Sequence, residues 1–272
     1  MNILKFIESF TTENMMNVKG SRRDIFSQVG LVGKNAALTA IPFGIAALTS
    51  TKASAAVKDS TSGNPVAALQ LALTLEYLEN EFYQLGLDSG VIPAGGREEK
   101  VFMQIAAHEA DHVTFLQNGL GANSISKPTF DFTVGGVFDP FNKTGIGNAD
   151  AYTQFLVLAQ AFEDTGVRAY KGQAANLIST PDLLTAALRI HSVEARHASE
   201  VRRLRGLKGW ITGSERGAGM PAATQAVYNG EEVTSQAGFN TALLFGAAAG
   251  SEAYDEPLTG AEAVAIASLF IV

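Results

Sequence analysis

Residues 105–112 read IAAHEADH, and residues 190–197 read IHSVEARH. Both segments fit the pattern Ile-x-x-x-Glu-x-x-His, so each ends with a glutamate and a histidine three residues apart. Residues at this spacing lie on one face of an α-helix, where their side chains can hold one metal ion between them. All four histidines of the chain fall within these two segments, which therefore predict two metal-binding helices. The ligand pairs are Glu109 with His112 and Glu194 with His197.

Hydrophobic residues at helical spacing predict four long helices around these segments. The first begins at Asn64 and Pro65, an N-cap followed by a proline at the first helical position, where the missing N–H costs nothing. Residues 121–149 are rich in Gly, Pro, Asn, Thr and Phe and predict a long connection, with a short hairpin around residues 132–138. This pattern is typical of an all-α fold in which two helical hairpins form a four-helix bundle. The helices are expected at about residues 65–85, 97–118, 148–178 and 181–205.

An internal repeat relates the two predicted hairpins. Glu76 is followed seven residues later by Tyr83, and the second hairpin has Glu163 and Tyr170 at the same spacing. Such a repeat implies a pseudo-twofold axis, on which the two metal sites would meet. One glutamate from each of two helices and Glu-x-x-His from each of the other two is the ligand set of the di-iron and di-manganese carboxylate proteins. The predicted metal ligands are Glu76, Glu109, His112, Glu163, Glu194 and His197.

Charge supports a pair of metal ions in this ligand set. The four glutamates carry a charge of about -4, which two divalent cations would cancel, whereas without metal they would repel one another in a poorly solvated core. Glu79 lies one helical turn from Glu76 and is the alternative first ligand, while Glu81 lies about 100° further round and is expected in solvent. Tyr83 and Tyr170 are expected near the metals, as hydrogen-bond donors or as redox-active groups.

His108 supports a competing interpretation. Residues 108–112 also match the His-Glu-x-x-His signature of zinc metallopeptidases, in which two histidines bind zinc and the glutamate is the base. The second segment has Val193 at the equivalent position, so the peptidase element is not what repeats. We expect His108 and His191 to lie beside the ligands or at the surface, with His191 able to hydrogen-bond a ligand carboxylate.

Composition limits the chemistry that the chain can perform. Its 272 residues include no cysteine and give a formal net charge of -7. Disulfides, thiolate ligands and a cysteine nucleophile are therefore excluded, and a metal must be held by nitrogen and oxygen atoms. Nucleic acid is not expected as a partner of a chain with this charge and no long basic block. We expect two Fe ions, with Mn or Zn as the alternatives.

The N-terminal residues resemble an export signal. Residues 21–26, SRRDIF, precede a weakly apolar stretch and the Ala-Ser-Ala sequence at residues 53–55, which is typical of a twin-arginine signal with a cleavage site. Lys34, Asn35 and Pro42 interrupt the apolar stretch, so no stable membrane span is expected after processing, and an uncleaved anchor is the alternative. We therefore expect a periplasmic or secreted protein. The expected divisions are residues 1–55 for the signal, 56–206 for the bundle and 207–272 for a C-terminal extension.

The C-terminal extension has a different composition from the bundle. Residues 206–250 are rich in Gly, Ala and Thr and contain the only tryptophan, Trp210. Thr259 and Glu262 then form a Thr-x-x-Glu capping box before the apolar sequence AVAIASLFIV. This box predicts a short fifth helix that packs on the bundle.

At these residues the chain resembles the ferritin-like superfamily, and more closely the exported ferritin-like domain family that contains plant desiccation-related proteins. The resemblance is carried by the segments LTLEYLENEFY, HEADH, AFEDTGVRAY and VEARH. It implies an up-down-down-up bundle around a carboxylate-bridged metal pair. By that analogy Glu109 and Glu194 bridge the two ions, His112 and His197 each bind one, and Glu76 and Glu163 are terminal ligands.

Two functions are compatible with this resemblance. The first is an exported di-iron protein that oxidises Fe(II), or reduces O2 or peroxide, in iron handling or oxidative-stress defence. The second is a stress or desiccation protein without turnover, in which metal only stabilises the fold by binding it. The sequence leaves open whether the protein is an enzyme and how many chains assemble, with a homodimer as one option.

Overall fold

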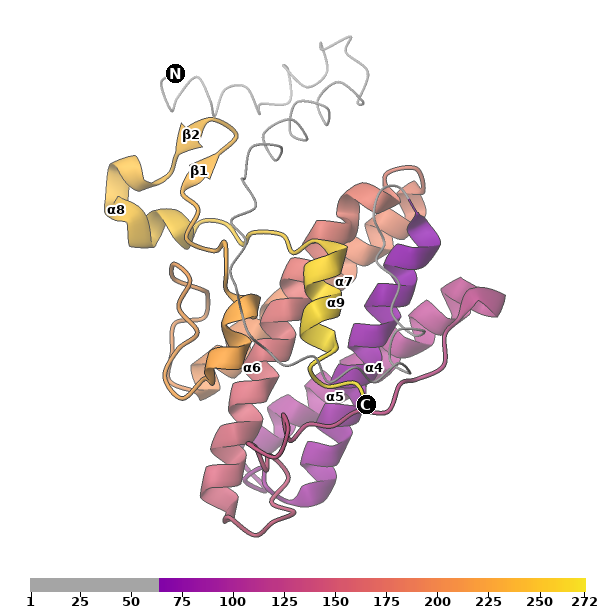
Figure 1. Ribbon diagram of the computed structural model, residues 1–272, viewed down its shortest axis with the longest axis vertical. Coiled ribbons are helices and arrows are strands. Elements are labelled where there is room, and N and C mark those ends of the chain that lie inside the picture. The colour runs from indigo at the N-terminus through magenta and orange to yellow at the C-terminus, as the bar shows by residue number, and fades with distance from the viewer. Residues whose placement is uncertain (1–63) are drawn as a thin grey trace. The chain divides into compact units, whose positions relative to one another are not determined.

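A computed structural model describes residues 64–272, and the predicted signal at residues 1–55 lies outside the described residues. Four long helices form a bundle, as expected from the sequence (Figure 1). The helices begin and end within a few residues of the expected positions, except that the third ends earlier and a short 3-10 helix follows it. The long helices are α4 (Pro65–Ser89), α5 (Arg97–Leu120), α6 (Asn148–Gln173) and α7 (Pro181–Leu204), and the 3-10 helix is η4 (Ala174–Leu177).

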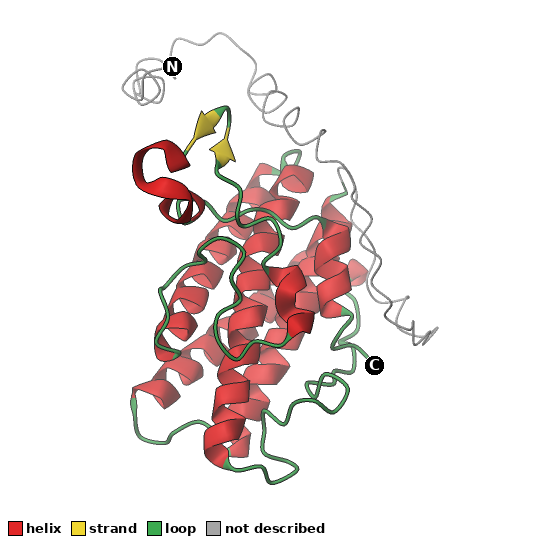
Figure 2. Cartoon of the chain, turned by 60° about the vertical axis from the view of Figure 1, so that its left-hand side comes forward, coloured by secondary structure: helices red, strands yellow, loops and turns green. Residues whose placement is uncertain are grey.

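The four long helices pack as two pairs. These helices are among those drawn red in Figure 2. Helix α4 lies along α5, α6 lies along α7, and α4 also contacts α6. The side chain of Asn64 accepts a hydrogen bond from the backbone N–H of Ala67, and Gly90 ends α4 in the left-handed conformation, so both ends of this helix are set by local sequence. The all-α bundle of two hairpins predicted from the sequence is confirmed.

The connection between α5 and α6 contains no hairpin. Residues 132–137 form turns, and the Phe138 N–H donates to the Thr133 carbonyl within this segment. The expectation of a short hairpin at residues 132–138 was therefore wrong. Phe130 instead forms an isolated antiparallel bridge with Ile271, close to the C-terminus. Sequence alone could not show this pairing because the two residues are far apart in the chain.

The C-terminal extension contains several short elements. The capping box at Thr259 and Glu262 starts α9, as predicted. Ala263 and Ala267 of this helix pack against Leu71 of α4 and against neighbouring residues of α6. The short side chains on this face let α9 approach the two long helices closely. The elements of the extension are η5 (Ala222–Val227), β1 (Ser235–Gln236), β2 (Phe239–Asn240), α8 (Ala242–Ser251) and α9 (Gly260–Ala267).

Helix α6 is buried on all sides between residues 155 and 170, because the extension covers the face that α4 and α7 leave free. A helix with this degree of burial would normally be apolar throughout. The outer face of α6 instead carries Gln160, Asp164 and Arg168, which are four residues apart and therefore form one stripe. Each of these polar side chains bonds to groups from later in the chain, so the stripe attaches the extension to the bundle.

Arg168 is among the largest fully buried side chains in the described residues. Its Nε lies 2.6 Å from Glu231 Oε1 and donates to the Glu256 carbonyl at 2.8 Å. The remaining guanidinium nitrogens donate to the carbonyls of Val227 and Asn229. One cation therefore satisfies several backbone carbonyls and one carboxylate that are buried together, which explains why a segment with little apolar periodicity folds against α6.

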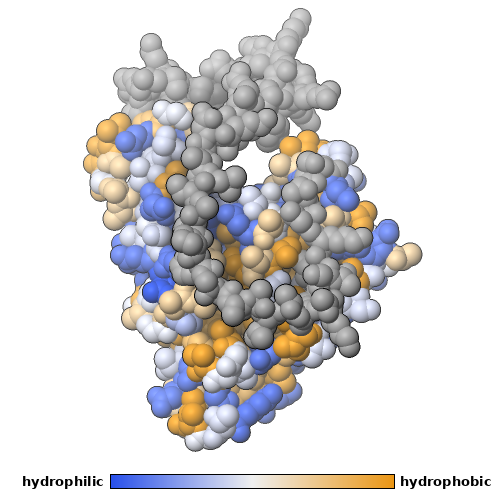
Figure 3. Space-filling model, viewed as in Figure 1, coloured by the Kyte–Doolittle hydropathy of each residue, from blue (hydrophilic) through white to orange (hydrophobic). Residues whose placement is uncertain are grey.

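Helix α8 exposes apolar side chains. Leu243, Leu244 and Phe245 are exposed at its start, and apolar surface is visible over this helix in Figure 3. Among the helices that the structure describes, none is both long enough and apolar enough to cross a membrane.

Replacing Gly172 of α6 with alanine is expected to push the backbone at Leu258, in the C-terminal extension, away from α6. A Cβ atom at Gly172 would lie 1.7 Å from the Leu258 carbonyl oxygen, a backbone atom that cannot rotate away. We expect the unfolding free energy, measured by denaturant titration, to fall by at least about 1–3 kcal/mol. The matched control is Gly119→Ala in α5, which meets nothing within 4 Å and should gain about 0.5–1 kcal/mol. Equal stabilities for the two variants would contradict the packing.

Candidate metal centre

The six predicted ligand side chains converge inside the bundle. All six are buried, and the four glutamates have no exposed surface. They come from four different helices, because each long helix turns one face to the common axis. Their ligand atoms fall into two groups, within each of which the atoms lie no more than 4.8 Å apart, and Glu109 and Glu194 belong to both. The first group is Glu76, Glu109, His112 and Glu194, and the second is Glu109, Glu163, Glu194 and His197.

In the first group, His112 faces three carboxylates. Its Nδ1 atom lies 3.0 Å from Glu109 Oε2, 3.1 Å from Glu194 Oε1 and 3.2 Å from Glu76 Oε2. One imidazole nitrogen and three carboxylate oxygens thus surround a single small volume. Nitrogen and oxygen donors of this kind suit first-row divalent metals.

The second group repeats this arrangement around His197. Its Nδ1 atom lies 2.9 Å from Glu109 Oε1, 3.3 Å from Glu163 Oε2 and 3.7 Å from Glu194 Oε2. Glu109 and Glu194 therefore each turn one oxygen toward His112 and the other toward His197. The two groups of ligand atoms therefore overlap at these two carboxylates, which is consistent with a site for a pair of ions.

The two predicted tyrosines follow the same pseudo-symmetry. Tyr83 of α4 donates a hydrogen bond to Glu163 Oε1 of α6, and Tyr170 of α6 donates to Glu76 Oε1 of α4. Each tyrosine thus holds the outer oxygen of the glutamate on the other helix, leaving the second oxygen to face the histidines. Burial and the neighbouring carboxylate raise the pKa of both phenols well above the usual value, so both remain neutral donors.

Several buried ligand atoms have no hydrogen-bond partner. Among the described residues, eight buried side-chain nitrogen or oxygen atoms lack one, and five of them belong to this cluster. Although His197 Nδ1 is close to Glu109, their orientation does not form a hydrogen bond. Leaving so many polar atoms unpaired in a core is costly, whereas metal ions between them would satisfy all of them. The cluster therefore fits a pair of metal ions. The five atoms are Glu109 Oε1, Glu163 Oε2, both Glu194 oxygens and His197 Nδ1.

Without metal, protons must balance the charge of the cluster. Burial lowers the pKa of His112 and His197, but the surrounding carboxylates outweigh this effect and raise both well above the usual value. Burial would raise the pKa of Glu194, but the two histidines beside its oxygens lower it to about 2. Burial raises the pKa of Glu163 to about 7, against the effect of His197, and burial with the charge of Glu194 raises that of Glu109. The metal-free cluster therefore holds two imidazolium ions around an ionised Glu194.

Metal binding is consequently expected to release protons. A ligand histidine must be neutral and a ligand carboxylate ionised, so two ions must displace at least the two protons of His112 and His197 at pH 7. Calorimetric titrations with Zn(II) in buffers of different ionisation enthalpy count these protons. We expect about two or more protons per pair of ions, rising at lower pH as Glu163 becomes protonated. Release of fewer than about one proton would show that the metal ions do not displace the protons of these two histidines.

Glu79 adds a fifth carboxylate beside the cluster. It is buried, but it belongs to neither group of converging ligand atoms, whereas its alternative Glu76 belongs to the first. Burial, and then the charges of Glu194 and Glu163, raise the pKa of Glu79 well above the usual value. A Cβ atom at Gly166 would lie 3.4 Å from Glu79 Oε1, so the absence of a side chain there leaves room for this carboxylate. The sequence did not indicate that both glutamates would be buried together.

The two remaining histidines have different surroundings. His191 Nδ1 lies 3.0 Å from the Val167 carbonyl, so the expectation that His191 would bond a ligand carboxylate was wrong. His108 Nδ1 lies 2.9 Å from His197 Nε2, on the side of that ring away from the cluster. Neither group of converging ligand atoms includes His108. The peptidase interpretation requires His108 and His112 on one ion, and the geometry does not provide this arrangement.

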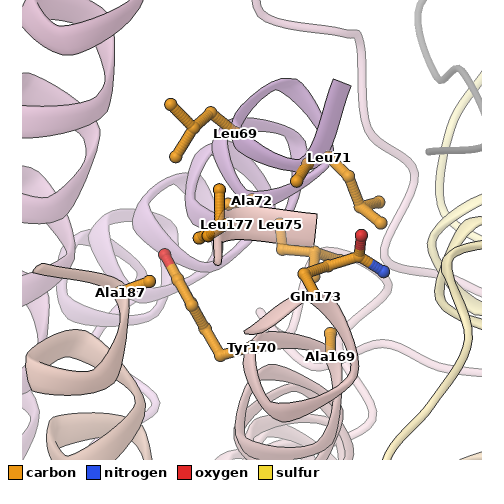
Figure 4. Close-up of a pocket in the computed structure, with 10 residues that line it drawn as sticks. Leu69, Leu71, Ala72, Leu75, Ala169, Tyr170, Gln173, Leu177 and Ala187 are labelled. Atoms are coloured by element: carbon orange, nitrogen blue, oxygen red, sulfur yellow. The ribbon is translucent and has the colours of Figure 1, made fainter. Parts of the chain in front are cut away.

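One side of the cluster is closed by apolar packing. Figure 4 shows Tyr170 of α6 next to leucine and alanine side chains of α4 around a small void. The void has a volume of about 10 Å³, which is room for about one water molecule. A larger molecule therefore cannot reach Tyr170 through this void without a movement of α4 or η4.

Comparisons with known proteins agree with this geometry. The model of a ferritin-like domain family matches residues 64–207, the range that contains the bundle and all six predicted ligands. Neither curated proteins nor solved structures gave a match.

Proposed function

The chain belongs to the ferritin-like domain family, and we propose that its buried glutamate and histidine cluster binds two iron ions and uses them in oxidation chemistry with O2 or peroxide. The observation that carries the proposal is the sharing of Glu109 and Glu194 between two groups of converging ligand atoms. A single-ion site needs no such sharing. Mn or Zn could occupy the same nitrogen and oxygen ligands, so iron is part of the proposal.

The protein side chains would have three roles in this chemistry. A bound pair of iron ions would supply the electrons that reduce O2 or peroxide. The carboxylates of Glu109 and Glu194 would hold both ions, and His112 and His197 would each give one nitrogen to one ion. Tyr83 and Tyr170 would hold the outer oxygens of Glu163 and Glu76 by hydrogen bonds. Burial of all these groups keeps bulk water away.

Anaerobic reconstitution with Fe(II), followed by admission of O2 or peroxide, tests the proposal. We expect about two iron ions per chain and oxidation of both, followed by absorbance of the oxidised metal. Glu81→Gln is a suitable control, because Glu81 forms a surface ion pair with Lys127 and is not in the cluster. Fewer than about one bound ion, or two bound ions that O2 and peroxide leave unchanged, would overturn the proposed oxidation.

A structural role for the metal is the second candidate, and it is favoured by the origin of the ligands. The two groups connect four helices, so bound ions would link every long helix of the bundle. Metal would then raise the unfolding free energy by linkage, with no turnover. Melting temperature and peroxide consumption of His197→Ala separate the candidates. If the wild-type protein consumes no peroxide and the variant loses only the rise in melting temperature that metal causes, the role is structural. If the variant loses both this rise and the peroxide consumption of the wild-type protein, the metal acts in oxidation.

We further propose that the protein acts outside the cytoplasm, where the twin-arginine sequence at residues 21–26 would direct it. Its proposed partners are O2 or peroxide and a second copy of the chain. Fractionation of cells that express the full chain, compared with a variant in which Arg22 and Arg23 are both lysine, tests the location. Equal amounts of both proteins outside the cytoplasm would contradict it.

A further inference from the structure

A surface pocket lies on the outer side of His197. Its volume is about 550 Å³, and the residues that line it come from α5, the turn before it and α7. Pockets of this size commonly hold small organic ligands. His197 is therefore the one predicted metal ligand that lines this pocket, and its other face reaches the metal centre.

His108 connects the pocket to His197. Its Nδ1 atom lies 2.9 Å from His197 Nε2, and the two rings are nearly parallel, at 12°. Its Nε2 atom lies 2.7 Å from the amide nitrogen of Gln104, which also lines the pocket. The second helix of the repeat has Val193 in place of His108, so the repeat does not give His112 an equivalent histidine partner. The two metal positions are thus inequivalent, although the ligands themselves follow the pseudo-symmetry.

The charge of the pocket is opposite to that of the protein. The chain has a formal net charge of -7, yet the charged residues that line the pocket are mostly basic. Glu200 is the acidic residue among them, and it pairs with Arg97. Lys100 and Arg196 are exposed and form no ion pair with the described residues. Two unpaired cations from different helices therefore face one pocket, which favours an anion with more than one oxygen.

We propose that this pocket binds a small oxyanion of the carboxylate or phosphate class between Lys100 and Arg196. Gln104 also lines the pocket, and its amide has a second N–H, besides the one that faces His108, to donate to the same ligand. The bound anion lies against the outer side of the His108–His197 pair. Its charge therefore acts more strongly on the metal position beside His197 than on the one beside His112. Binding itself does not depend on the proposed oxidation; only its effect on the metal position rests on the proposed function.

Calorimetric titration of the full-length protein, as purified and after chelation, tests the binding step. The probes are inorganic phosphate and succinate at constant ionic strength. We expect saturable binding of at least one probe, weakened about tenfold by Lys100→Gln and by Arg196→Gln, because each removes a charged hydrogen-bond donor. The conservative Arg196→Lys should keep most of the affinity. Binding of phosphate alone identifies a phosphoryl ligand, binding of succinate alone identifies a carboxylate, and binding of both identifies a general oxyanion site.

Arg189→Gln is the matched control, since Arg189 is an exposed arginine on the same helix outside the pocket. It should leave the affinity unchanged. Equal weakening by Arg189→Gln and Arg196→Gln, or no saturable binding of either probe, would overturn the proposal. Because the titration of the chelated protein contains no metal, failure here leaves the metal centre untouched, and failure of iron binding leaves this result standing.

Nuclear magnetic resonance places the anion independently. The chain has four histidines, so selective ¹⁵N labelling gives a small set of ring signals that single substitutions can assign. We expect the bound anion to shift the signals of His108 and His197 and to leave that of His191 unchanged. Arg196→Gln should raise the anion concentration needed for half of these shifts by about tenfold. Shifts confined to His191 would show that the anion binds elsewhere and would overturn the proposal.

Discussion

Replacing Glu194 with alanine is expected to abolish the binding of both metal ions. Glu194 belongs to both groups of converging ligand atoms and turns one oxygen toward each ligand histidine. Its loss therefore removes a ligand from both positions at once, and we expect the affinity to fall by well over about 100-fold, since even a partner of a ligand can cost 10–100-fold. Metal content after dialysis against micromolar Fe(II) or Zn(II) measures the effect.

Glutamates that belong to only one of the two groups of ligand atoms provide the comparison with Glu194→Ala. Glu76→Gln and Glu163→Gln each alter one group, so each should leave about one ion bound. These variants also protect the test against a failure of Glu194→Ala to fold, because Glu194 balances the two buried imidazolium ions in the metal-free protein. If Glu194→Ala kept two ions, or if Glu76→Gln lost both, the shared arrangement would be wrong.

Replacing Arg168 with alanine is expected to cause the largest loss of stability outside the metal centre. The substitution leaves Glu231 buried without its cation and several backbone carbonyls of the extension without a donor. Breaking a buried ion pair by removing one partner costs about 3–5 kcal/mol. We expect a loss of that size in the unfolding free energy, measured by urea titration of the chelated protein.

The matched control removes an arginine from an exposed ion pair. Arg97 pairs with Glu200 at the surface, and its side chain is 62% exposed. Arg97→Ala should therefore cost no more than about 1 kcal/mol. A loss of less than about 1 kcal/mol in Arg168→Ala would mean that the extension does not depend on this arginine. Glu231→Gln would show the same dependence from the other partner, at a smaller cost, because burial already raises the pKa of Glu231 to about 7.

The sequence predicted the bundle well because its helices are set by local signals. Apolar periodicity, the Asn64 cap and the capping box at Thr259 all act within a few residues. The Glu-x-x-His spacing likewise places two side chains on one face whatever surrounds the helix. The internal repeat then predicted a pseudo-twofold relation between the two hairpins, although no contact between them can be read from the sequence.

The polar stripe of α6 was not predicted, for a physical reason. Gln160, Asp164 and Arg168 have the spacing of a solvated helix face, and sequence alone gives no cause to bury them. Their partners lie tens of residues later, in a segment without periodicity, so only the folded chain shows that Tyr228 and Glu231 satisfy them. Long-range bonds of this kind leave no local signal in the sequence.

The surroundings of the metal centre were also beyond local reasoning. Gly166 occupies the position that the repeat assigns to Glu79, and the space above this glycine admits the extra carboxylate. The contact of His108 with His197 crosses from α5 to α7. Spacing along one helix predicts which side chains share a face, but it does not predict which neighbour from another helix they meet.

X-ray absorption at the iron edge of the reconstituted protein tests the two-ion centre most directly. The proposed ligand set predicts nitrogen and oxygen neighbours only, with about one histidine per iron, and a second iron at a distance of about 3.5–4 Å. A spectrum with the same light neighbours and no second iron in a sample that holds two ions per chain would contradict the shared positions of Glu109 and Glu194.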